Sequence, residues 1–160
     1  ILLSTQNPAL SHLGFPTVTD EFAGIGPIAG LYSALRASRT RHNLVIPCDT
    51  PNVDGSVFER LLANAGGYLA AVAGTADGLK EPLIGYYDRS SWEILQQQIL
   101  AGDNKLQNAL GRLQARIEVF SDASLFLNLN SPSDLRRGVL SAPGGNEEGN
   151  GREECRAMPC

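Results

Sequence analysis

The fold of this chain is decided by the stretch NLVIPCDTP, at residues 43–51, which joins an apolar run to a polar turn. Residues 44–46 are Leu, Val and Ile, and a short uninterrupted apolar run is typical of a strand buried on both faces of a parallel sheet. Pro47 ends the run, and Asp49 follows closely. We therefore predict a strand over residues 43–47 with an aspartate just beyond its carboxyl end.

The segments around this strand alternate between short apolar runs and helical patterns. After Pro27, apolar side chains recur at i, i+3, i+4 and i+7, which predicts an amphipathic helix that ends at about Ser38. This alternation is typical of βαβ units, so we predict an α/β fold, a Rossmann-like three-layer sandwich with a mostly parallel sheet. The same reasoning predicts further strands at residues 1–5, 15–19, 69–73, 83–87, 117–120 and 125–129, and further helices at residues 9–13, 55–65, 104–113 and 132–139 and around residues 92–99.

Length and composition indicate one domain with a real core. The chain has 160 residues, of which 42% are hydrophobic and 19% charged, and it therefore belongs with globular rather than disordered sequences. Residues 143–160 contain no Ile, Leu, Val or Phe. Such a segment cannot bury enough apolar surface to offset its ordering entropy, so we predict a domain over residues 1–142 and a disordered tail over residues 143–160.

Charge and cysteine content exclude several classes of partner. A formal net charge of −4 argues against nucleic-acid binding, which needs a dense basic surface. The apolar runs are too short to span a bilayer, so no membrane partner is expected. Three cysteines are too few for a disulfide framework, which favours a cytoplasmic protein, and we expect Cys48 to be a small buried residue rather than a nucleophile.

Two predicted strand ends could bind an anionic ligand, because open parallel sheets bind ligands beyond the carboxyl ends of their strands. Asp49 is placed to bind Mg²⁺ beside a triphosphate, although an aspartate there could equally cap the following turn. Asp20 follows the strand at residues 15–19 and precedes GIGPIAG at residues 24–30. The helix that begins there offers free N–H groups to an anion, but the segment also fits a plain loop-to-helix junction.

A third strand end carries two asparagines. Asn128 and Asn130 follow the strand predicted at residues 125–129, where an i, i+2 spacing would place both amides on one side, facing a polar heterocycle. The alternative is that Asn130 or Ser131 caps the helix that Pro132 would begin.

Taken in order, these motifs resemble a known family over roughly residues 1–138. The chain resembles the molybdenum cofactor guanylyltransferases of the nucleotide-diphospho-sugar transferase superfamily. Glu81 stands where that family usually has a histidine. The stretches that carry the resemblance are FPTVTD at 15–20, GPIAGL at 26–31, PCDTP at 47–51, EPL at 81–83 and NLNSPSDL at 128–135.

The resemblance implies a reaction and a set of residue roles. GMP would pass from GTP to Mo-molybdopterin with Mg²⁺, giving the guanine dinucleotide cofactor and pyrophosphate, and molybdoenzyme apoproteins or their chaperones would receive the product. Asp49 would be the catalytic residue that binds Mg²⁺ and nucleotide, and Asp20 would bind nucleotide. Ser4 occupies a nucleotide-binding position where the family often has an asparagine, and Asn128 and Asn130 would face the pterin.

The family also opens with a glycine-rich loop, LAGG followed by RMG and DK, that cradles the triphosphate. Since the chain has no counterpart, we expect that this loop and the first strand are missing, that the chain is N-terminally truncated, and that alone it has weak activity or none. Two alternatives remain. One is a CTP-dependent molybdopterin cytidylyltransferase or related nucleotidyltransferase, and the other is a non-catalytic α/β binding module.

Overall fold

The computed structural model describes residues 1–129, and Ile1–Asn128 form one folding unit. The helix predicted at residues 132–139 and the domain boundary predicted after residue 142 lie outside the described residues.

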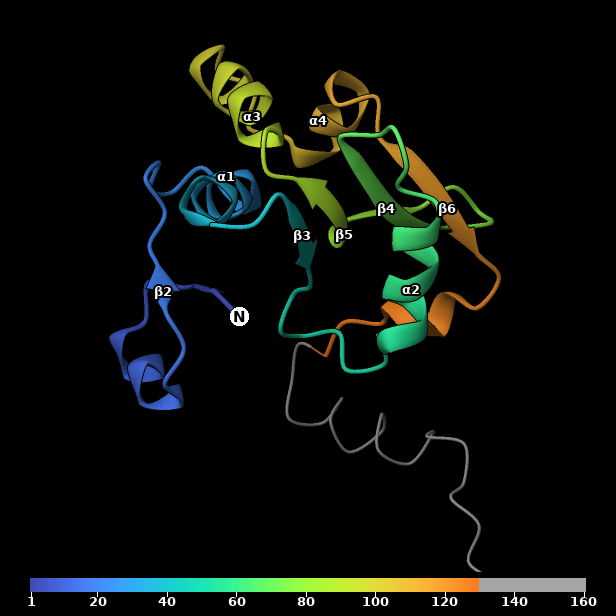
Figure 1. Ribbon diagram of the computed structural model, residues 1–160, viewed down its shortest axis with the longest axis horizontal. Helices are drawn as coiled ribbons and strands as arrows, with labels where there is room; N and C mark the ends of the chain where they lie inside the picture. The colour runs from blue at the N-terminus through green and yellow to red at the C-terminus, as the bar shows by residue number, and fades with distance from the viewer. Residues whose placement is uncertain (130–160) are drawn as a thin grey trace, which may run out of the picture. The chain divides into compact units, whose positions relative to one another are not determined.

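The centre of this unit is a four-stranded sheet of order β3-β5-β4-β6 (Figure 1). Its strands are β3 (His42–Val45), β4 (Ala70–Thr75), β5 (Lys80–Asp88) and β6 (Arg116–Phe120). A second sheet pairs β1 (Leu3–Ser4) with β2 (Thr17–Val18) in parallel. β4 and β6 are parallel neighbours, whereas β5 is antiparallel to both β3 and β4, so β3, β4 and β6 run in one direction and β5 alone is reversed.

The reversal of β5 follows from the length of the connection before it. Only residues 76–79 separate β4 from β5, and a parallel neighbour would need a crossover of about a dozen residues or more. The turn is closed by hydrogen bonds from the amide of Thr75 to the carbonyl of Leu79 at 2.9 Å and from Gly78 to Thr75 at 3.0 Å. A hairpin is therefore the connection that this sequence allows.

Helices cover both faces of the sheet, which confirms the predicted α/β class and its three layers (Figure 1). On one face lie α1 (Pro27–Ala37), α3 (Ser91–Leu100) and α4 (Leu106–Arg112). On the other lie α2 (Gly55–Ala63) and the 3-10 helix η2 (Ala123–Phe126). A further 3-10 helix, η1 (Pro8–Leu13), connects β1 to β2.

Successive side chains of β4 point to opposite faces of the sheet and so belong to two different layers of the core. Ala70 and Val72 belong to the layer under α1, α3 and α4, and Ala71 and Ala73 belong to the layer under α2. All six residues of β4 are buried, as expected for a central strand covered on both sides.

The strand predicted at residues 125–129 is wrong, since residues 123–126 form η2 instead. The carboxylate of Asp122 accepts hydrogen bonds from the amide of Ser124 at 2.9 Å and from its hydroxyl at 2.6 Å. This local cap starts a helical turn, which aims Phe126 into the core against Phe120, with ring centroids 5.5 Å apart. The turn chemistry of one aspartate thus outweighs the apolar character of the segment.

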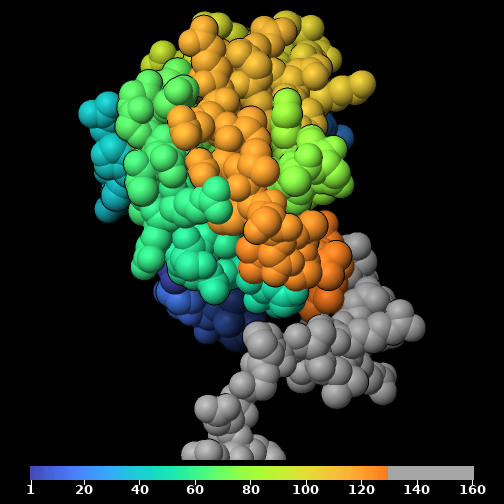
Figure 2. All heavy atoms as spheres, turned by 90° about the vertical axis from the view of Figure 1, so that its right-hand side faces the viewer, coloured from blue at the N-terminus to red at the C-terminus, as the bar shows by residue number. Residues whose placement is uncertain are grey.

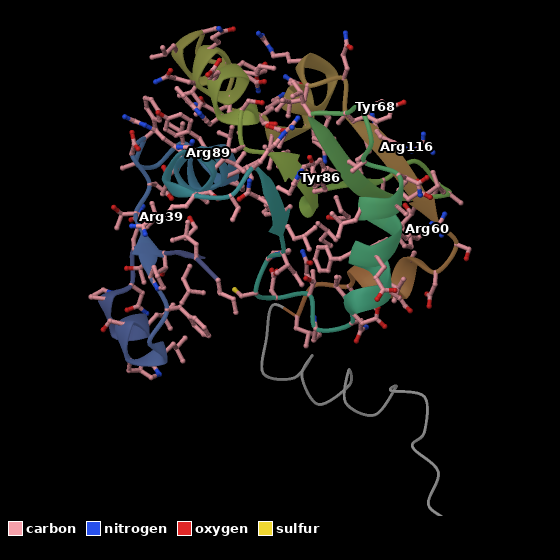
Figure 3. All side chains as sticks on the ribbon, viewed as in Figure 1. Arg39, Arg60, Tyr68, Tyr86, Arg89 and Arg116 are labelled. Carbon is pink, nitrogen blue, oxygen red and sulfur yellow. The ribbon has the colours of Figure 1, made fainter. Side chains whose placement is uncertain are left out.

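A charged network ties α2 to the edge strand β6. Glu118 is buried, and it accepts a hydrogen bond from Nε of Arg60 at 2.8 Å and lies 3.5 Å from Nε of Arg116. Each guanidinium also lies over an aromatic ring, Arg60 at 4.5 Å from the ring centroid of Phe120 and Arg116 at 5.9 Å from that of Tyr68. Figure 3 labels Arg60, Arg116 and Tyr68. Figure 2 shows β6, in orange, at the surface between α2 and the β4–β5 connection, where these contacts hold it.

Close packing in the β4–β5 hairpin gives a test of the fold. We expect Gly85→Ala to lower the free energy of unfolding by about 2 kcal/mol, because the new Cβ would lie 2.8 Å from Cγ1 of Val72 and 2.9 Å from the carbonyl of Ala71. Urea denaturation measures the change. Gly111→Ala is the control, since its Cβ meets open space in α4 and should raise stability by about 0.5 kcal/mol. A Gly85→Ala protein as stable as wild type would contradict this packing.

Candidate active site

The turn that carries Asp49 lies at the carboxyl edge of the sheet, directly after β3. Thr50 is buried, and its hydroxyl donates to the carbonyl of Pro47 at 3.2 Å, which closes the turn. Asn52 donates from Nδ2 to the carbonyl of Ser124 in η2 at 2.9 Å and so fastens the loop to a distant segment. The half-buried Asp49 is therefore presented by a fixed loop.

Glu81 lies at the same edge of the sheet as the turn that carries Asp49. β5 is antiparallel to β3, and it therefore begins at the edge where β3 ends. The pKa of the half-buried Glu81 is raised first by burial and then by the negative charge of Asp49.

A second pair of predicted site residues meets on α1. Ser4 ends β1 and Asp20 follows β2, and both side chains reach Gly30 in the second turn of the helix. A Cβ atom built on Gly30 would lie 3.1 Å from Oγ of Ser4 and 3.4 Å from Oδ1 of Asp20. Gln6 donates from Nε2 to the other oxygen of Asp20 at 3.4 Å. The missing side chain of Gly30 is what allows this close approach.

The start of α1 is the segment predicted to bind an anion. Gly26 caps the helix with φ of 91°, a conformation that favours glycine, and no side chain forms a capping hydrogen bond there. Pro27 has no N–H group, Ile28 and Ala29 are fully buried, and the amide of Ala29 donates to the carbonyl of Gly26 at 3.1 Å. The first three helical residues therefore present no accessible N–H group to an anion, and only the positive end of the helix dipole favours one.

Only one of the two predicted asparagines can be placed. Asn128 is exposed in the segment after η2, and Asn130 lies outside the described residues. Their alignment depended on a strand at residues 125–129, and this segment forms a 3-10 turn instead.

Two residues differ from their sequence-based interpretation. Cys48 is exposed, not buried, because the chain has already left β3 and turns at the surface. Glu81, which stands where the similar family usually has a histidine, lies at the start of β5, where burial and then the charge of Asp49 raise its pKa. The one signal in the sequence is that Glu81 closely follows the short turn after β4. A short turn forms a hairpin, and a hairpin returns the chain to the edge of the sheet where β4 ends.

The donor chemistry at this edge fits Mg²⁺, which binds through one or two carboxylates and takes its other ligands from phosphate and water. Asp49 and Glu81 supply such carboxylates. Within residues 1–129 no group of three or more His, Cys, Asp or Glu side chains gathers as a dedicated metal cage.

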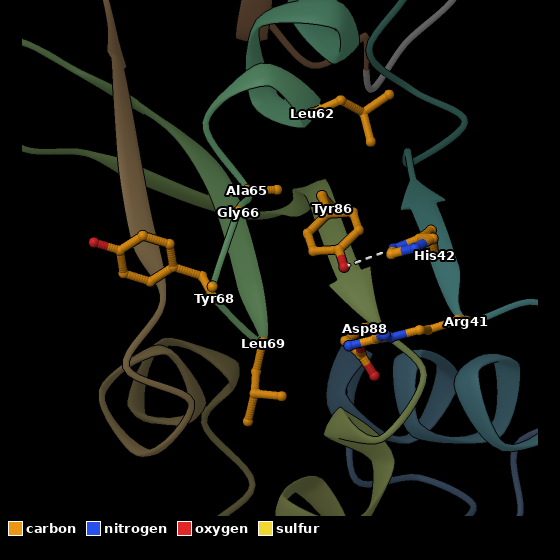
Figure 4. Close-up of a pocket in the computed structure, with 10 residues that line it drawn as sticks. Arg41, His42, Leu62, Ala65, Gly66, Tyr68, Leu69, Tyr86 and Asp88 are labelled. Carbon is orange, nitrogen blue, oxygen red and sulfur yellow. Dashed lines mark hydrogen bonds and ion pairs between the residues drawn. The ribbon is translucent and has the colours of Figure 1, made fainter.

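A pocket of about 450 Å³ opens at the opposite edge, near the amino end of β3 (Figure 4). Nδ1 of the exposed His42 and the hydroxyl of Tyr86 are hydrogen-bonded at 2.9 Å, and Nε of Arg41 donates to Asp88 at 2.8 Å. Leu62 and Tyr68 complete the apolar side of the pocket. None of the predicted site residues lines it.

The pocket contains the most strongly perturbed carboxylate of this edge. Burial alone would raise the pKa of Asp88, but hydrogen bonds from Arg41 and from the amide and hydroxyl of Ser90 outweigh burial and lower it to about 2. The ionised form is thus favoured in the folded protein.

A three-layer α/β sandwich with polar side chains at the carboxyl edge of its sheet is the architecture of nucleotide-binding α/β proteins. Residues 1–117 match the family model of the MobA-like NTP transferase domain. The chain belongs to this family.

Individual relatives agree with this membership. The "Probable molybdenum cofactor guanylyltransferase" of Carboxydothermus hydrogenoformans is 26% identical over 144 residues, covering 86% of this chain and 73% of that protein. The molybdenum cofactor guanylyltransferase of Shewanella sp. strain MR-4 is 29% identical over 130 residues, covering 79% of this chain and 66% of that protein. The crystal structure of molybdopterin-guanine dinucleotide biosynthesis protein A from Archaeoglobus fulgidus has a TM-score of 0.69 and 26% identity, covering 88% of this chain and 78% of that one.

As for bilayers, the helices found in residues 1–129 include none with both the length and the apolar character needed to cross one.

The perturbed carboxylate predicts how stability depends on pH. Because the pKa of Asp88 is lowered on folding, its stabilisation is present above about pH 4 and is lost as the pH falls toward 2. Asp88→Asn should therefore lower the free energy of unfolding by about 2 kcal/mol at pH 7, and the difference from wild type should shrink in acid. Urea denaturation at several pH values checks this, with Glu59→Gln, an exposed carboxylate of α2, as the control. A difference that is constant with pH would show that the ion pair is not its cause.

Proposed function

We propose that this protein is a molybdenum cofactor guanylyltransferase that transfers GMP from GTP to Mo-molybdopterin and releases pyrophosphate. The observation that carries the proposal is the presentation of Asp49 by a fixed loop at the carboxyl edge of the sheet. The names of the relatives support the same reaction.

The proposed reaction is a displacement at phosphorus. An oxygen of the molybdopterin phosphate forms a bond to the α-phosphorus of GTP, and the bond from that phosphorus to the β-phosphate oxygen breaks, so that pyrophosphate leaves with the electron pair. Two polyanions must approach each other, and the main tasks of the protein are alignment and neutralisation of charge. Mg²⁺, when bound, supplies positive charge to the phosphate oxygens.

The proposed reaction gives a role to Asp49 and to the pair formed by Asp20 and Ser4. Asp49 would hold the cation and orient the triphosphate beside it. Asp20 and Ser4 would contact the nucleoside part, where the carboxylate can accept hydrogen bonds and the hydroxyl can donate or accept one. Their position against α1 leaves them in a fixed geometry, since Gln6 holds Asp20 from one side.

The proposal also covers the contacts to the acceptor, the domain boundary and the cell compartment. Asn128 and Asn130 would contact the pterin side of the acceptor, and the domain would extend to residue 142. The enzyme would act in the cytoplasm, and molybdoenzyme apoproteins or their chaperones would take up the finished cofactor.

The direct test titrates GTP or CTP, each with Mg²⁺, into the full-length protein and measures the heat of binding. We expect GTP to bind in preference to CTP and Asp49→Asn to weaken GTP binding at least about tenfold, because the cation loses its anchoring carboxylate. Asp77→Asn is a matched control, since it removes the same charge from the β4–β5 turn at the same sheet edge.

The other outcomes would each redirect the assignment. Preference for CTP would identify a cytidylyltransferase. Binding of neither nucleotide would leave a non-catalytic α/β module, and equal losses in the Asp49 and Asp77 variants would show a bulk charge effect.

The close approach of Ser4 and Asp20 to Gly30 in α1 gives a second test of the nucleotide site. Gly30→Ala should weaken GTP binding several-fold, because the added Cβ would crowd Oγ of Ser4 at 3.1 Å and Oδ1 of Asp20 at 3.4 Å. The fold should keep its stability, since Ala favours a helix over Gly by about 1 kcal/mol. Calorimetry and thermal melts measure the two effects, with Gly111→Ala as a control that adds the same methyl group in open space. Unchanged GTP affinity would remove Ser4 and Asp20 from the site.

A further inference from the structure

One side chain of the loop between β3 and α2 reaches η2 at the other end of the chain. Asn52 donates from Nδ2 to the carbonyl of Ser124 at 2.9 Å. The same carbonyl accepts the amide of Leu127 at 3.4 Å, a bond that closes the helical turn of η2. A carbonyl oxygen has two lone pairs and can accept both bonds. The side chain of Asn52 therefore holds the turn from which the chain continues to Asn128.

The acceptor of this bond is itself fixed. The carboxylate of Asp122 accepts hydrogen bonds from the amide of Ser124 at 2.9 Å and from its hydroxyl at 2.6 Å. Two residues further on, Phe126 is buried in the core, with its ring centroid 5.5 Å from that of Phe120. Because η2 is capped at its start and packed at its end, a bond to its carbonyl ties the loop to a segment with a defined position.

The other contacts of the loop point inward and give it shape. The hydroxyl of the buried Thr50 donates to the carbonyl of Pro47 at 3.2 Å, and the amide of Val53 donates to the carbonyl of Thr50 at 3.3 Å. Val53 also packs against the apolar cluster beneath α2. Among the hydrogen bonds found in residues 1–129, that of Asn52 alone joins this loop to η2.

This bond connects the two sides of the proposed reaction. The loop carries Asp49, which would hold the cation and the triphosphate, and η2 leads to Asn128, which would contact the acceptor. Displacement at phosphorus needs the attacking oxygen aligned with the α-phosphorus, and a misplacement of about 1 Å can cost about a hundredfold in rate. A contact that fixes one segment against the other therefore affects alignment more than affinity for GTP.

We propose that Asn52 is a positioning residue of the transfer, which aligns the nucleotide with its acceptor by holding the loop of Asp49 against the segment of Asn128. The proposal rests on the proposed function, which assigns the donor to one segment and the acceptor to the other. Asn52 acts through the carbonyl of Ser124 and needs no contact with either substrate.

The test measures release of pyrophosphate by the full-length protein with GTP, Mo-molybdopterin and Mg²⁺, and measures GTP binding by calorimetry. We expect Asn52→Ala to lower kcat about tenfold and to change the KM and Kd for GTP less than about twofold, because the loop keeps its turn and its packing. Asn52→Gln retains an amide donor and should recover part of kcat. Asn52→Asp should remain as low as Asn52→Ala, since an ionised carboxylate cannot donate.

Asn64→Ala is the matched control. It removes a hydrogen bond of the same kind, from Nδ2 of Asn64 to the carbonyl of Arg60 at 3.0 Å, at the end of α2. Both alanine variants should lower the Tm by about 2–4 °C, but only Asn52→Ala should lower kcat. Asp122→Ala removes the cap that fixes Ser124, so its combination with Asn52→Ala should lower kcat by less than the product of the two single effects.

The outcomes separate this inference from the proposed function. Wild-type kcat in Asn52→Ala, an equal loss in Asn64→Ala or fully multiplied effects in the double variant would overturn the role of Asn52, while turnover by the wild type would still support the transferase. A loss of GTP affinity as large as the loss of kcat would assign Asn52 to the nucleotide site and overturn its role in alignment. A wild-type protein that binds GTP and releases no pyrophosphate would overturn the proposed reaction, and this inference with it.

Discussion

The antiparallel course of β5 between β3 and β4 determines the chemistry of this protein more than any other feature. A strand that entered by a crossover would begin at the opposite edge of the sheet, whereas the short β4–β5 turn returns the chain to the edge it has just left. The start of β5 therefore shares an edge with the end of β3, and the charge of Asp49 contributes there to the raised pKa of Glu81.

The local pattern was enough to predict most elements. The apolar repeat after Pro27 predicted α1, because its period follows the buried face of the helix. The run at residues 43–47 predicted a strand, but burial on both faces in a parallel sheet was wrong: β3 is an edge strand, antiparallel to β5, and Leu44 is 48% exposed. The prediction at residues 125–129 failed because one side-chain cap, that of Asp122, overrides a weak apolar signal. The meeting of Ser4 with Asp20 depends on the pairing of β1 with β2 and on close approach at Gly30, which no single segment encodes.

Charge is distributed unevenly over the two edges of the sheet. At the amino end of β3, Arg41 neutralises Asp88, and on the face beneath α2, Arg60 and Arg116 surround Glu118. Such pairs fix the structure, because removing the arginines would leave a buried carboxylate without its partner. At the carboxyl edge, none of the ion pairs found among residues 1–129 includes Asp49 or Glu81.

The hydrogen bond from Asn52 to Ser124 has a consequence for the order in which the molecule forms. It joins residues 72 positions apart, so the loop that carries Asp49 lacks this anchor until the chain beyond β6 has been made. During synthesis, the sheet from β3 to β5 can assemble while that loop is still open. The loop that carries Asp49 can thus gain this anchor only after β3, β4, β5 and β6 have all been synthesised.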